Sequence, residues 1–444
     1  MDAEDPLAGI RDRFAVDDSV TYLDGNSLGA LPRSVPGRMA EVIEREWGEL
    51  RIRSWEESGW WTAPERIGDR IAPLIGAGPG QVVVGDSTSV NVFKAVVAAV
   101  RIAQARGGAE AEAEASAEAT EANAAAGSGR MAPPRRSDRS DRGDRGDGDD
   151  PQDGVRNGVR DEVLVDASTF PTDGYIAESA ARLTGCRIRA VAPGDMPAEI
   201  GPRTAVVLVN HVDYRTGRLH DLPVTTAAAH TAGALVVWDL CHSAGALPVG
   251  LDAHEVDFAV GCTYKYLNGG PGAPAYLYVR RDHQPRFDSP LPGWNSHADP
   301  FGMAPSYAPA DGSVRGRVGT PDILSMLALE AALEVWEGVS IEAVREKSLA
   351  LTDFFLDCVA RYAPSGRVES ITPAAHAERG SQVALRCSGA DEVMRELTAR
   401  GVVGDFRRPD VLRFGFTPLY TSFADAERAA RVLGAILGSA ERGA

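Results

Sequence analysis

Hydrophobic and polar residues follow two alternating patterns along most of this chain. Short apolar runs rich in valine occur at 81–84, 162–165, 204–209, 234–238, 256–262 and 275–279. Several runs are continuously apolar, which is typical of strands buried on both faces of a sheet. Stretches with helical spacing, such as 91–104 and 174–183, separate many of them. The alternation predicts a mainly parallel α/β sheet covered by helices.

The pattern changes near residue 318. Long amphipathic stretches at 322–338 and 341–361 are followed by short strand-like runs at 382–387 and 411–416, alternating with helical patterns at 390–400 and 423–438. We therefore expect three parts: an N-terminal segment, a large domain and a smaller α+β C-terminal domain. Their expected bounds are 1–40, 41–317 and 318–444.

One stretch, 107–158, fits no core. It consists of Ala/Glu repeats followed by Arg-Ser-Asp and Arg-Gly-Asp repeats, with almost no large apolar side chains. Such a segment cannot offset its own ordering entropy by burial. We expect a disordered insertion within the large domain, although its Ala/Glu half could form helix transiently.

Composition narrows the function classes. The 444 residues carry 46 Lys and Arg against 63 Asp and Glu, a formal net charge of −17. An acidic chain argues against a nucleic-acid or anionic-membrane partner, and no apolar run approaches the length of a membrane span. The five cysteines show no C-x-x-C pair, which argues against a disulfide framework or a thiolate zinc site. We expect a cytoplasmic enzyme that binds no metal.

Three groups of polar residues follow predicted strands. Lys265 precedes a glycine-rich turn, Asp239 directly follows an apolar run, and Ser87-Thr88-Ser89 leads into a helical pattern. Each has an ordinary alternative, namely a solvated loop lysine or a helix N-cap. Together, however, they place an amine, a carboxylate and an anion site at the carboxyl ends of strands, where α/β folds bind ligands.

That combination is what pyridoxal 5′-phosphate requires. The lysine amine forms a Schiff base with the cofactor, the carboxylate keeps the pyridine nitrogen protonated, and the helix N-terminus binds the phosphate. The sequence therefore predicts a fold-type I pyridoxal-phosphate enzyme.

At these positions the chain resembles the kynureninases, within the class V aminotransferase-like enzymes. The resemblance covers nearly the whole chain outside 107–158. The shared motifs, in order, are Tyr22-Leu-Asp-Gly-Asn-Ser-Leu-Gly29, Ser87-Thr-Ser-Val-Asn91, Phe170-Pro-Thr-Asp173, Tyr214-Arg-Thr-Gly217, Asp239-Leu-Cys-His242, Tyr264-Lys-Tyr-Leu-Asn268, Gly293-Trp294 with His297, Thr320-Pro321 and Arg413-Phe-Gly-Phe-Thr-Pro-Leu-Tyr-Thr-Ser-Phe423. The resemblance implies hydrolytic cleavage of L-kynurenine to anthranilate and L-alanine.

The resemblance also implies a role for each matching residue. Lys265 would form the Schiff base, Asp239 would pair with the ring nitrogen, and Tyr264 would donate a proton. Arg413 would bind the substrate α-carboxylate, and His297 would help to polarise the aryl ketone. The remaining cofactor contacts would come from Thr88, Ser89, Phe170, Asp173, Asn210 and His242, with Trp294 and Thr320 reaching across from the other subunit of a homodimer.

Two departures from the family pattern concern the substrate. Asn295 and Ser296 stand where an aromatic residue and glycine are usual. We therefore expect an altered pocket for the aryl end of the substrate. Thr320 replaces an asparagine of animal enzymes that prefer the 3-hydroxy substrate, which favours plain kynurenine. A modified kynurenine of a secondary-metabolite route also remains open, beside tryptophan catabolism and nicotinamide cofactor synthesis.

Three other function classes fit the sequence less well. An aminotransferase would use the same lysine and aspartate but not the motifs that begin at Tyr22 and Arg413. A cysteine desulfurase needs a reactive cysteine on a mobile loop, whereas Cys358 and Cys387 fall in helical and strand patterns. A regulatory scaffold that docks through 107–158 would not need an intact Lys265.

Overall fold

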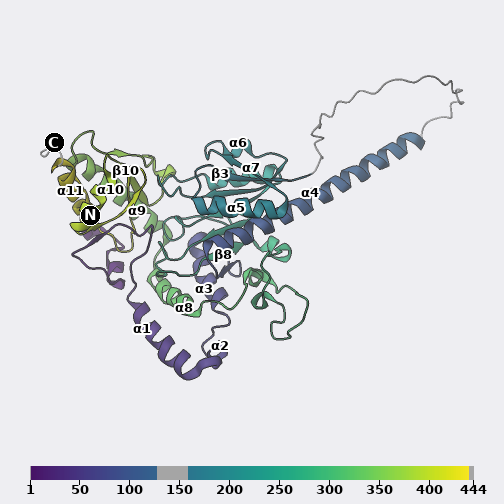
Figure 1. Ribbon diagram of the computed structural model, residues 1–444, viewed down its shortest axis with the longest axis horizontal. Helices are drawn as coiled ribbons and strands as arrows, with labels where there is room; N and C mark the ends of the chain where they lie inside the picture. The colour runs from purple at the N-terminus through teal and green to yellow at the C-terminus, as the bar shows by residue number, and fades with distance from the viewer. Residues whose placement is uncertain (1, 128–158, 440–444) are drawn as a thin grey trace, which may run out of the picture.

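The computed structural model describes residues 2–127 and 159–439, and it has the expected α/β architecture (Figure 1). The large domain contains a seven-stranded sheet in the order β2-β8-β7-β6-β5-β3-β4. Its strands are β2 (Val82–Val84), β3 (Glu162–Asp166), β4 (Arg187–Val191), β5 (Thr204–Asn210), β6 (Leu235–Asp239), β7 (Phe258–Gly261) and β8 (Tyr276–Val279). Only β8 pairs antiparallel with its neighbours, so the prediction of a mainly parallel sheet is confirmed.

Alternate residues of the central strands face two separate cores. In β5, for example, Val206 and Leu208 contribute to one core while Val207 and Val209 contribute to the other. Helices α4 (Thr88–Gly127) and α5 (Pro171–Thr184) cover the first face, and α3 (Ala63–Ile71), α7 (Leu222–Thr231) and α8 (Ile323–Ala332) cover the second. Burial on both faces explains why these strands are continuously apolar.

Strand β4 has no counterpart among the predicted strands. Its sequence, Arg187-Ile-Arg-Ala-Val191, lacks a continuous apolar run because β4 is an edge strand that pairs only with β3. Charged residues on an edge strand prevent association with other chains. The sequence signal therefore resembles that of a surface segment.

The structure also differs from the expectation for the stretch 107–158. Helix α4 continues through the Ala/Glu repeats to Gly127, and Figure 1 shows it projecting from the large domain. Alanine and glutamate have high helix propensity, and propagation from an existing helix avoids the cost of nucleation. The rest of the expected insertion, 128–158, lies outside the described residues.

The smaller domain combines an antiparallel sheet with three helices. The sheet has the order β12-β13-β10-β9, and the elements are α9 (Ile341–Tyr362), β9 (Glu369–Ser370), β10 (Gln382–Arg386), α10 (Ala390–Ala399), β12 (Asp405–Arg407), β13 (Val411–Gly415) and α11 (Phe423–Ser439). In the C-terminal part of the chain, Leu351 is the first residue of the smaller domain's core. Helix α8 packs instead in a core of the large domain.

The N-terminal segment connects the two domains. Strand β1 (Thr21–Tyr22) pairs in parallel with β11 (Val402–Val403) of the smaller domain, and Leu23 belongs to that domain's core. A few residues later, the Gly29 N–H donates to the Tyr264 carbonyl oxygen of the large domain at 2.7 Å. Residues 24–28 therefore cross the junction between the domains.

An arm follows this segment and projects from the body at the bottom of Figure 1. It comprises α1 (Ser34–Glu41), a π-helical stretch (Val42–Leu50), a 3₁₀ turn (Arg51–Arg53) and α2 (Ser54–Glu57). Its side chains Ile43, Trp47 and Ile52 are exposed. Among the described helices, none is long and apolar enough to cross a membrane.

A buried carboxylate fixes the start of β7. The Asp257 side chain accepts hydrogen bonds from the Val236 N–H and His230 Nε2, both at 2.9 Å, and from His283 Nε2 at 2.7 Å. Burial opposes the charge on Asp257, but the two histidines outweigh this effect and lower its pKa to about 2.

We predict that Asp257→Asn lowers the free energy of unfolding by about 3 kcal/mol at pH 7, because it leaves a buried polar cluster unpaired. The lowered pKa stabilises the fold above the unfolded-state pKa of about 3.9, and this contribution is lost as the pH falls towards 2. The difference in urea midpoint between wild type and variant should therefore become smaller as the pH falls from about 4 towards 2. The exposed neighbour Asp282→Asn is the control, and an equal effect of both substitutions would contradict this account.

Candidate active site

Lys265 lies in a tight turn that follows β7 at the carboxyl end of the sheet. The turn is closed by hydrogen bonds from the Asn268 N–H to the Lys265 carbonyl oxygen and from the Gly269 N–H to the Thr263 carbonyl oxygen, each at 2.9 Å. Asn268 has a φ of 58°, in the left-handed region that asparagine tolerates better than most residues. The turn holds the half-buried Lys265 with its Nζ 3.2 Å from His242 Nε2.

His242 is a neutral neighbour of this amine. Its Nε2 also lies 3.1 Å from the carbonyl oxygen of Asn26 in the N-terminal segment. Burial, followed by the nearby positive charges of Lys265 and Arg413, lowers the pKa of His242 well below its usual range. Because Nε2 holds at most one proton, it either donates to the Asn26 carbonyl oxygen or accepts from Lys265.

The second feature is a pair of buried carboxyl groups bridged by an amide. Asn210 and Asp239 are paired at the ends of neighbouring strands β5 and β6. The Asn210 Nδ2 donates to Asp239 at 2.8 Å and to Asp173, from the first turn of α5, at 2.9 Å. Thr169 donates to the Asn210 Oδ1 at 2.5 Å, which fixes the amide with its N–H groups towards the carboxyl groups.

The protonation of this pair follows from its position. Burial, and then the neighbouring Asp239, raise the pKa of Asp173 well above its ordinary value. Two carboxylates that share one buried site repel each other. Burial and the neighbouring carboxyl group therefore favour the protonated form of Asp173.

The third feature is the N-terminus of α4, where Thr88 and Ser89 are the first two residues. The preceding loop is strained at Asp86, whose φ is 56°. The buried Lys94 holds this loop in place, because its Nζ donates to Asp86 at 2.7 Å and to the Gly316 carbonyl oxygen at 2.6 Å. Free N–H groups and hydroxyls at a helix N-terminus suit an anion such as phosphate.

Aromatic groups surround these features. Phe170 is 42% exposed at the N-cap of α5, and its ring meets that of Tyr214 edge to face at 5.2 Å between centroids. Tyr264 lies beside Lys265, with the Lys265 Nζ 5.9 Å from the centre of its ring. The neighbouring Cys262 sulfur, and then burial, raise the pKa of the Tyr264 phenol, which therefore stays protonated at neutral pH.

Arg413 reaches the same region from β13 of the smaller domain. It is buried, with 1% of its surface exposed, so it does not form an exposed ion pair on the strand. Its Nε donates to Asp405 at 2.9 Å, its Nη1 to the Tyr214 carbonyl oxygen at 2.6 Å, and its Nη2 to the Ser27 Oγ at 2.9 Å. The three partners come from the smaller domain, the large domain and the N-terminal segment.

Trp294, His297 and Thr320 belong to a separate surface unit. Asn295 joins its two segments, since its Nδ2 donates to the Gly319 carbonyl oxygen at 3.1 Å and its Oδ1 accepts from Arg317 at 3.3 Å. The His297 ring contacts its own loop, at the Ser306 carbonyl oxygen and the Asp299 N–H. The structure does not bring these three residues to Lys265 within one chain.

The two residues that depart from the family pattern are buried in that unit. Asn295 is 3% exposed and Ser296 is fully buried, where the Ser296 Oγ accepts from the Tyr307 hydroxyl at 3.0 Å. Both side chains therefore support the loop from within. If they alter the aryl pocket, they would do so by shifting Trp294 and His297.

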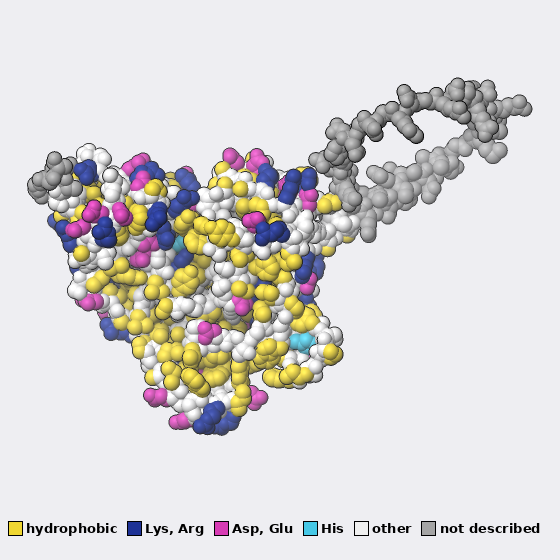
Figure 2. Space-filling model, in the orientation of Figure 1, with side chains coloured by type: hydrophobic (Ala, Val, Ile, Leu, Met, Phe, Trp, Pro, Cys, Tyr) yellow, Lys and Arg dark blue, Asp and Glu magenta, His cyan; other side chains and the backbone are white. Residues whose placement is uncertain are grey.

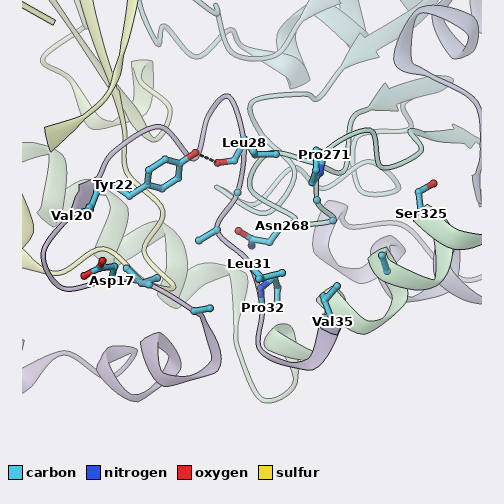
Figure 3. A pocket seen from close by; sticks show the side chains of 17 residues that line it. Asp17, Val20, Tyr22, Leu28, Leu31, Pro32, Val35, Asn268, Pro271 and Ser325 are labelled. Carbon is cyan, nitrogen blue, oxygen red and sulfur yellow. Dashed lines mark hydrogen bonds between the residues drawn. The ribbon is translucent and has the colours of Figure 1, made fainter. Parts of the chain in front are cut away.

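A cavity of about 600 Å³ lies beside the lysine turn (Figure 3). Asn268 and Pro271 of this turn line it, together with mostly apolar residues of the N-terminal segment. The Tyr22 hydroxyl donates to the Leu28 carbonyl oxygen at 2.7 Å within its wall. Lys265 lies outside this lining, so the cavity borders the candidate active site without containing it.

Sequence reasoning missed four supporting residues: Thr169, Lys94, Ser27 and Asp405. Ser27 and Thr169 stand next to or within quoted motifs, so proximity along the chain was a usable signal. Lys94 and Asp405 act through contacts that depend on the folded structure, Lys94 across to Gly316 and Asp405 across the β12–β13 pair.

Comparison with known proteins agrees with this geometry. Residues 344–433 match the family model of the kynureninase C-terminal domain. The chain is 46% identical to a kynureninase of Deinococcus radiodurans, over 99% of this chain and 96% of that protein. It is 43% identical to one of Burkholderia pseudomallei, over 98% and 94% respectively.

Solved structures show the same fold at lower identity. The apo cysteine desulfurase of Thermococcus onnurineus matches with a TM-score of 0.72 at 17% identity, covering 97% of this chain and 98% of that chain. The Escherichia coli cysteine desulfurase CsdA has the same TM-score and identity, covering 98% of both chains. These likenesses confirm the fold-type I architecture, and the much higher identity to the curated relatives shows that the chain belongs to the kynureninase family.

Proposed function

We propose that this protein binds pyridoxal 5′-phosphate and hydrolyses L-kynurenine to anthranilate and L-alanine. The observation that carries the proposal is the placement of the Lys265 amine at the same sheet edge as the amide-bridged pair of Asp173 and Asp239. The family relationship supports the same reaction.

The donor set fits the cofactor. Lys265 offers an amine for a Schiff base, and the buried carboxyl pair of Asp173 and Asp239 suits a protonated ring nitrogen. Thr88, Ser89 and the N-terminus of α4 suit the phosphate. The exposed ring of Phe170 provides a stacking face, with Asn210 and His242 completing the site. When bound, pyridoxal phosphate supplies an electron sink for carbanion chemistry at the substrate α- and β-carbons.

The residues of this chain then perform the proton transfers. Lys265 removes the proton from the α-carbon. His242 lies beside Lys265, but its lowered pKa means that it does not accept this proton in place of the lysine. Water attacks the γ-carbonyl carbon, and the bond between the β- and γ-carbons breaks to release anthranilate. Tyr264, which keeps its phenolic proton at neutral pH, protonates the β-carbon and recovers a proton from the attacking water. Lys265 returns a proton to the α-carbon, which completes L-alanine.

Residues at both ends of the substrate orient it. The buried Arg413 binds the α-carboxylate through paired N–H groups, a geometry that lysine cannot reproduce. At the aryl end, His297 of a second subunit would polarise the ketone. This assignment follows because His297 lies on a surface unit apart from Lys265 in its own chain.

A homodimer would bring that unit to the site, with Trp294 and Thr320 of one subunit contacting the cofactor phosphate of the other. Exposed apolar side chains support such an interface. Figure 2 shows hydrophobic surface gathered over its lower half, where α1 and α8 lie in Figure 1. Exposed apolar residues occur in and beside the arm and α8, namely Leu31, Ile43, Trp47, Ile52 and Leu324, and also in the stretch 294–303, namely Trp294, Phe301 and Met303. Contiguous apolar patches of this kind commonly mark protein interfaces.

The finer assignments belong to the same proposal. Thr320 favours plain kynurenine over the 3-hydroxy substrate, and the enzyme would act in the cytoplasm in tryptophan catabolism or nicotinamide cofactor synthesis.

The first prediction is the reaction itself. Purified protein supplied with pyridoxal phosphate should convert L-kynurenine to equimolar anthranilate and L-alanine, and should convert 3-hydroxy-L-kynurenine more slowly. Chromatography of the products checks both statements. Cofactor binding without cleavage of either substrate would contradict the proposal while leaving the fold assignment in place.

The second prediction concerns Lys265. Lys265→Ala should abolish turnover, and borohydride reduction should no longer attach the cofactor covalently to the peptide that carries this position. Lys265→Arg is the matched variant, because it keeps a positive charge but cannot form the Schiff base. Substantial turnover by either variant would contradict the role of Lys265.

The third prediction separates chemistry from binding at Asp239. Asp239→Asn keeps the size of the side chain but removes the charge that holds the ring nitrogen protonated. We expect kcat to fall by about 100-fold or more, with the apparent affinity for L-kynurenine changed much less. An unchanged kcat would show that Asp239 is not the partner of the ring nitrogen.

A further inference from the structure

The guanidinium of Arg413 is already paired on one side by a carboxylate of its own domain. Asp405 on β12 stands directly opposite Arg413 on β13 in the sheet register. Its Oδ1 accepts from Arg413 Nε at 2.9 Å, and its Oδ2 accepts from Arg413 Nη2. Asn26, with its amide oriented so that both its groups are satisfied, also places its oxygen 2.8 Å from Nε.

A guanidinium has two edges that can bind a carboxylate through two parallel hydrogen bonds. One is the side edge, formed by Nε and one Nη, and the other is the end edge, formed by both Nη atoms. Asp405 occupies the side edge. A second carboxylate can therefore pair with Arg413 only at the end edge.

The contacts at the end edge are uncharged. The Tyr214 carbonyl oxygen accepts from Nη1 at 2.6 Å, and the Ser27 Oγ accepts from Nη2 at 2.9 Å. Hydrogen bonds between ions are stronger than those from an ion to a neutral group. A substrate carboxylate can therefore replace these neutral acceptors with a gain in hydrogen-bond strength. Replacing Asp405 would bring no such gain, because one carboxylate would be exchanged for another.

Asp405 is itself held in place. Its Oδ2 accepts from Arg407 at 2.8 Å and from the Ser27 hydroxyl at 2.9 Å. Arg407 balances the charge of Asp405, so Arg413 retains net positive charge for a ligand. Ser27 touches both Asp405 and Arg413, which links the N-terminal segment to the orientation of the pair.

We propose that Asp405 is a positioning residue that holds the side edge of Arg413 and reserves the end edge for the α-carboxylate of the substrate. The inference rests on the proposed function, which makes Arg413 the carboxylate-binding residue. It adds that specificity for an amino-acid carboxylate depends on a second carboxylate within the protein.

The test uses the holoenzyme and two probes for opposite ends of the substrate. L-Alanine, a product, carries the α-carboxylate, and its binding is followed by the change in cofactor absorbance. 2-Aminoacetophenone carries the aryl ketone without the amino-acid group, and it is measured as a competitive inhibitor.

Asp405→Asn should weaken L-alanine binding and raise KM for L-kynurenine by about tenfold or more, the range expected when one charged hydrogen-bond pair is lost. Inhibition by 2-aminoacetophenone and kcat should change less than about threefold. Asp410→Asn is the matched control. Asp410 lies in the turn between β12 and β13 and pairs with Arg386 of β10, with 3.3 Å between Arg386 Nε and Asp410 Oδ2.

Asp405→Glu provides a second variant, which keeps the charge but displaces the guanidinium by one methylene. It too should weaken L-alanine binding and spare 2-aminoacetophenone. Equal weakening of both probes in both variants would show a structural role only and would overturn the inference. Wild-type L-alanine binding in either variant would overturn it as well.

Arg413→Lys separates this inference from the proposed function. If Arg413→Lys loses L-alanine binding while Asp405→Asn keeps it, the role of Arg413 stands and the role of Asp405 fails. If Arg413→Lys also binds L-alanine normally, Arg413 is not the carboxylate-binding residue.

Discussion

The hydrogen-bonded contact of Asn210 with two buried carboxyl groups is the constraint on which the rest of the site depends. Two carboxylates buried at the carboxyl end of the sheet repel each other and lose their hydration. The amide of Asn210 donates to both, and the raised pKa of Asp173 favours its protonated form, which weakens the repulsion. The result is a buried carboxyl pair near an amine, an arrangement suited to a cationic heterocycle.

Several elements are needed to build that contact. The register of β5 against β6 sets Asn210 beside Asp239, and the first turn of α5 brings Asp173 to both. Thr169, in the loop before α5, orients the amide. The opposite side of the site comes from elsewhere, because Arg413 belongs to the smaller domain and contacts the N-terminal segment at Ser27. The active site is thus a junction of three parts of the chain, and binding a substrate carboxylate would tie them together.

Much of this arrangement could be predicted from the sequence. Continuous apolar runs located six of the seven strands of the large sheet, and polar residues directly after them located Lys265 and Asp239. Strand β4 was not predicted because an edge strand carries charges. The helix of the Ala/Glu repeats was expected only as transient structure, because their low apolar content is typical of a loop. Asp405 had no local signal, since its role depends on pairing with β13 in the folded chain. The roles of Trp294 and Thr320 rest on the proposed second subunit.

The most direct test of the account is the protonation state of the bound cofactor's ring nitrogen. Holoenzyme prepared with ¹⁵N-labelled pyridoxal phosphate would be measured by NMR at neutral pH, for the wild type and for Asp239→Asn. The account predicts the chemical shift of a protonated pyridinium nitrogen in the wild type and of an unprotonated nitrogen in the variant. An unprotonated nitrogen in the wild type would contradict the central role given to the carboxyl pair.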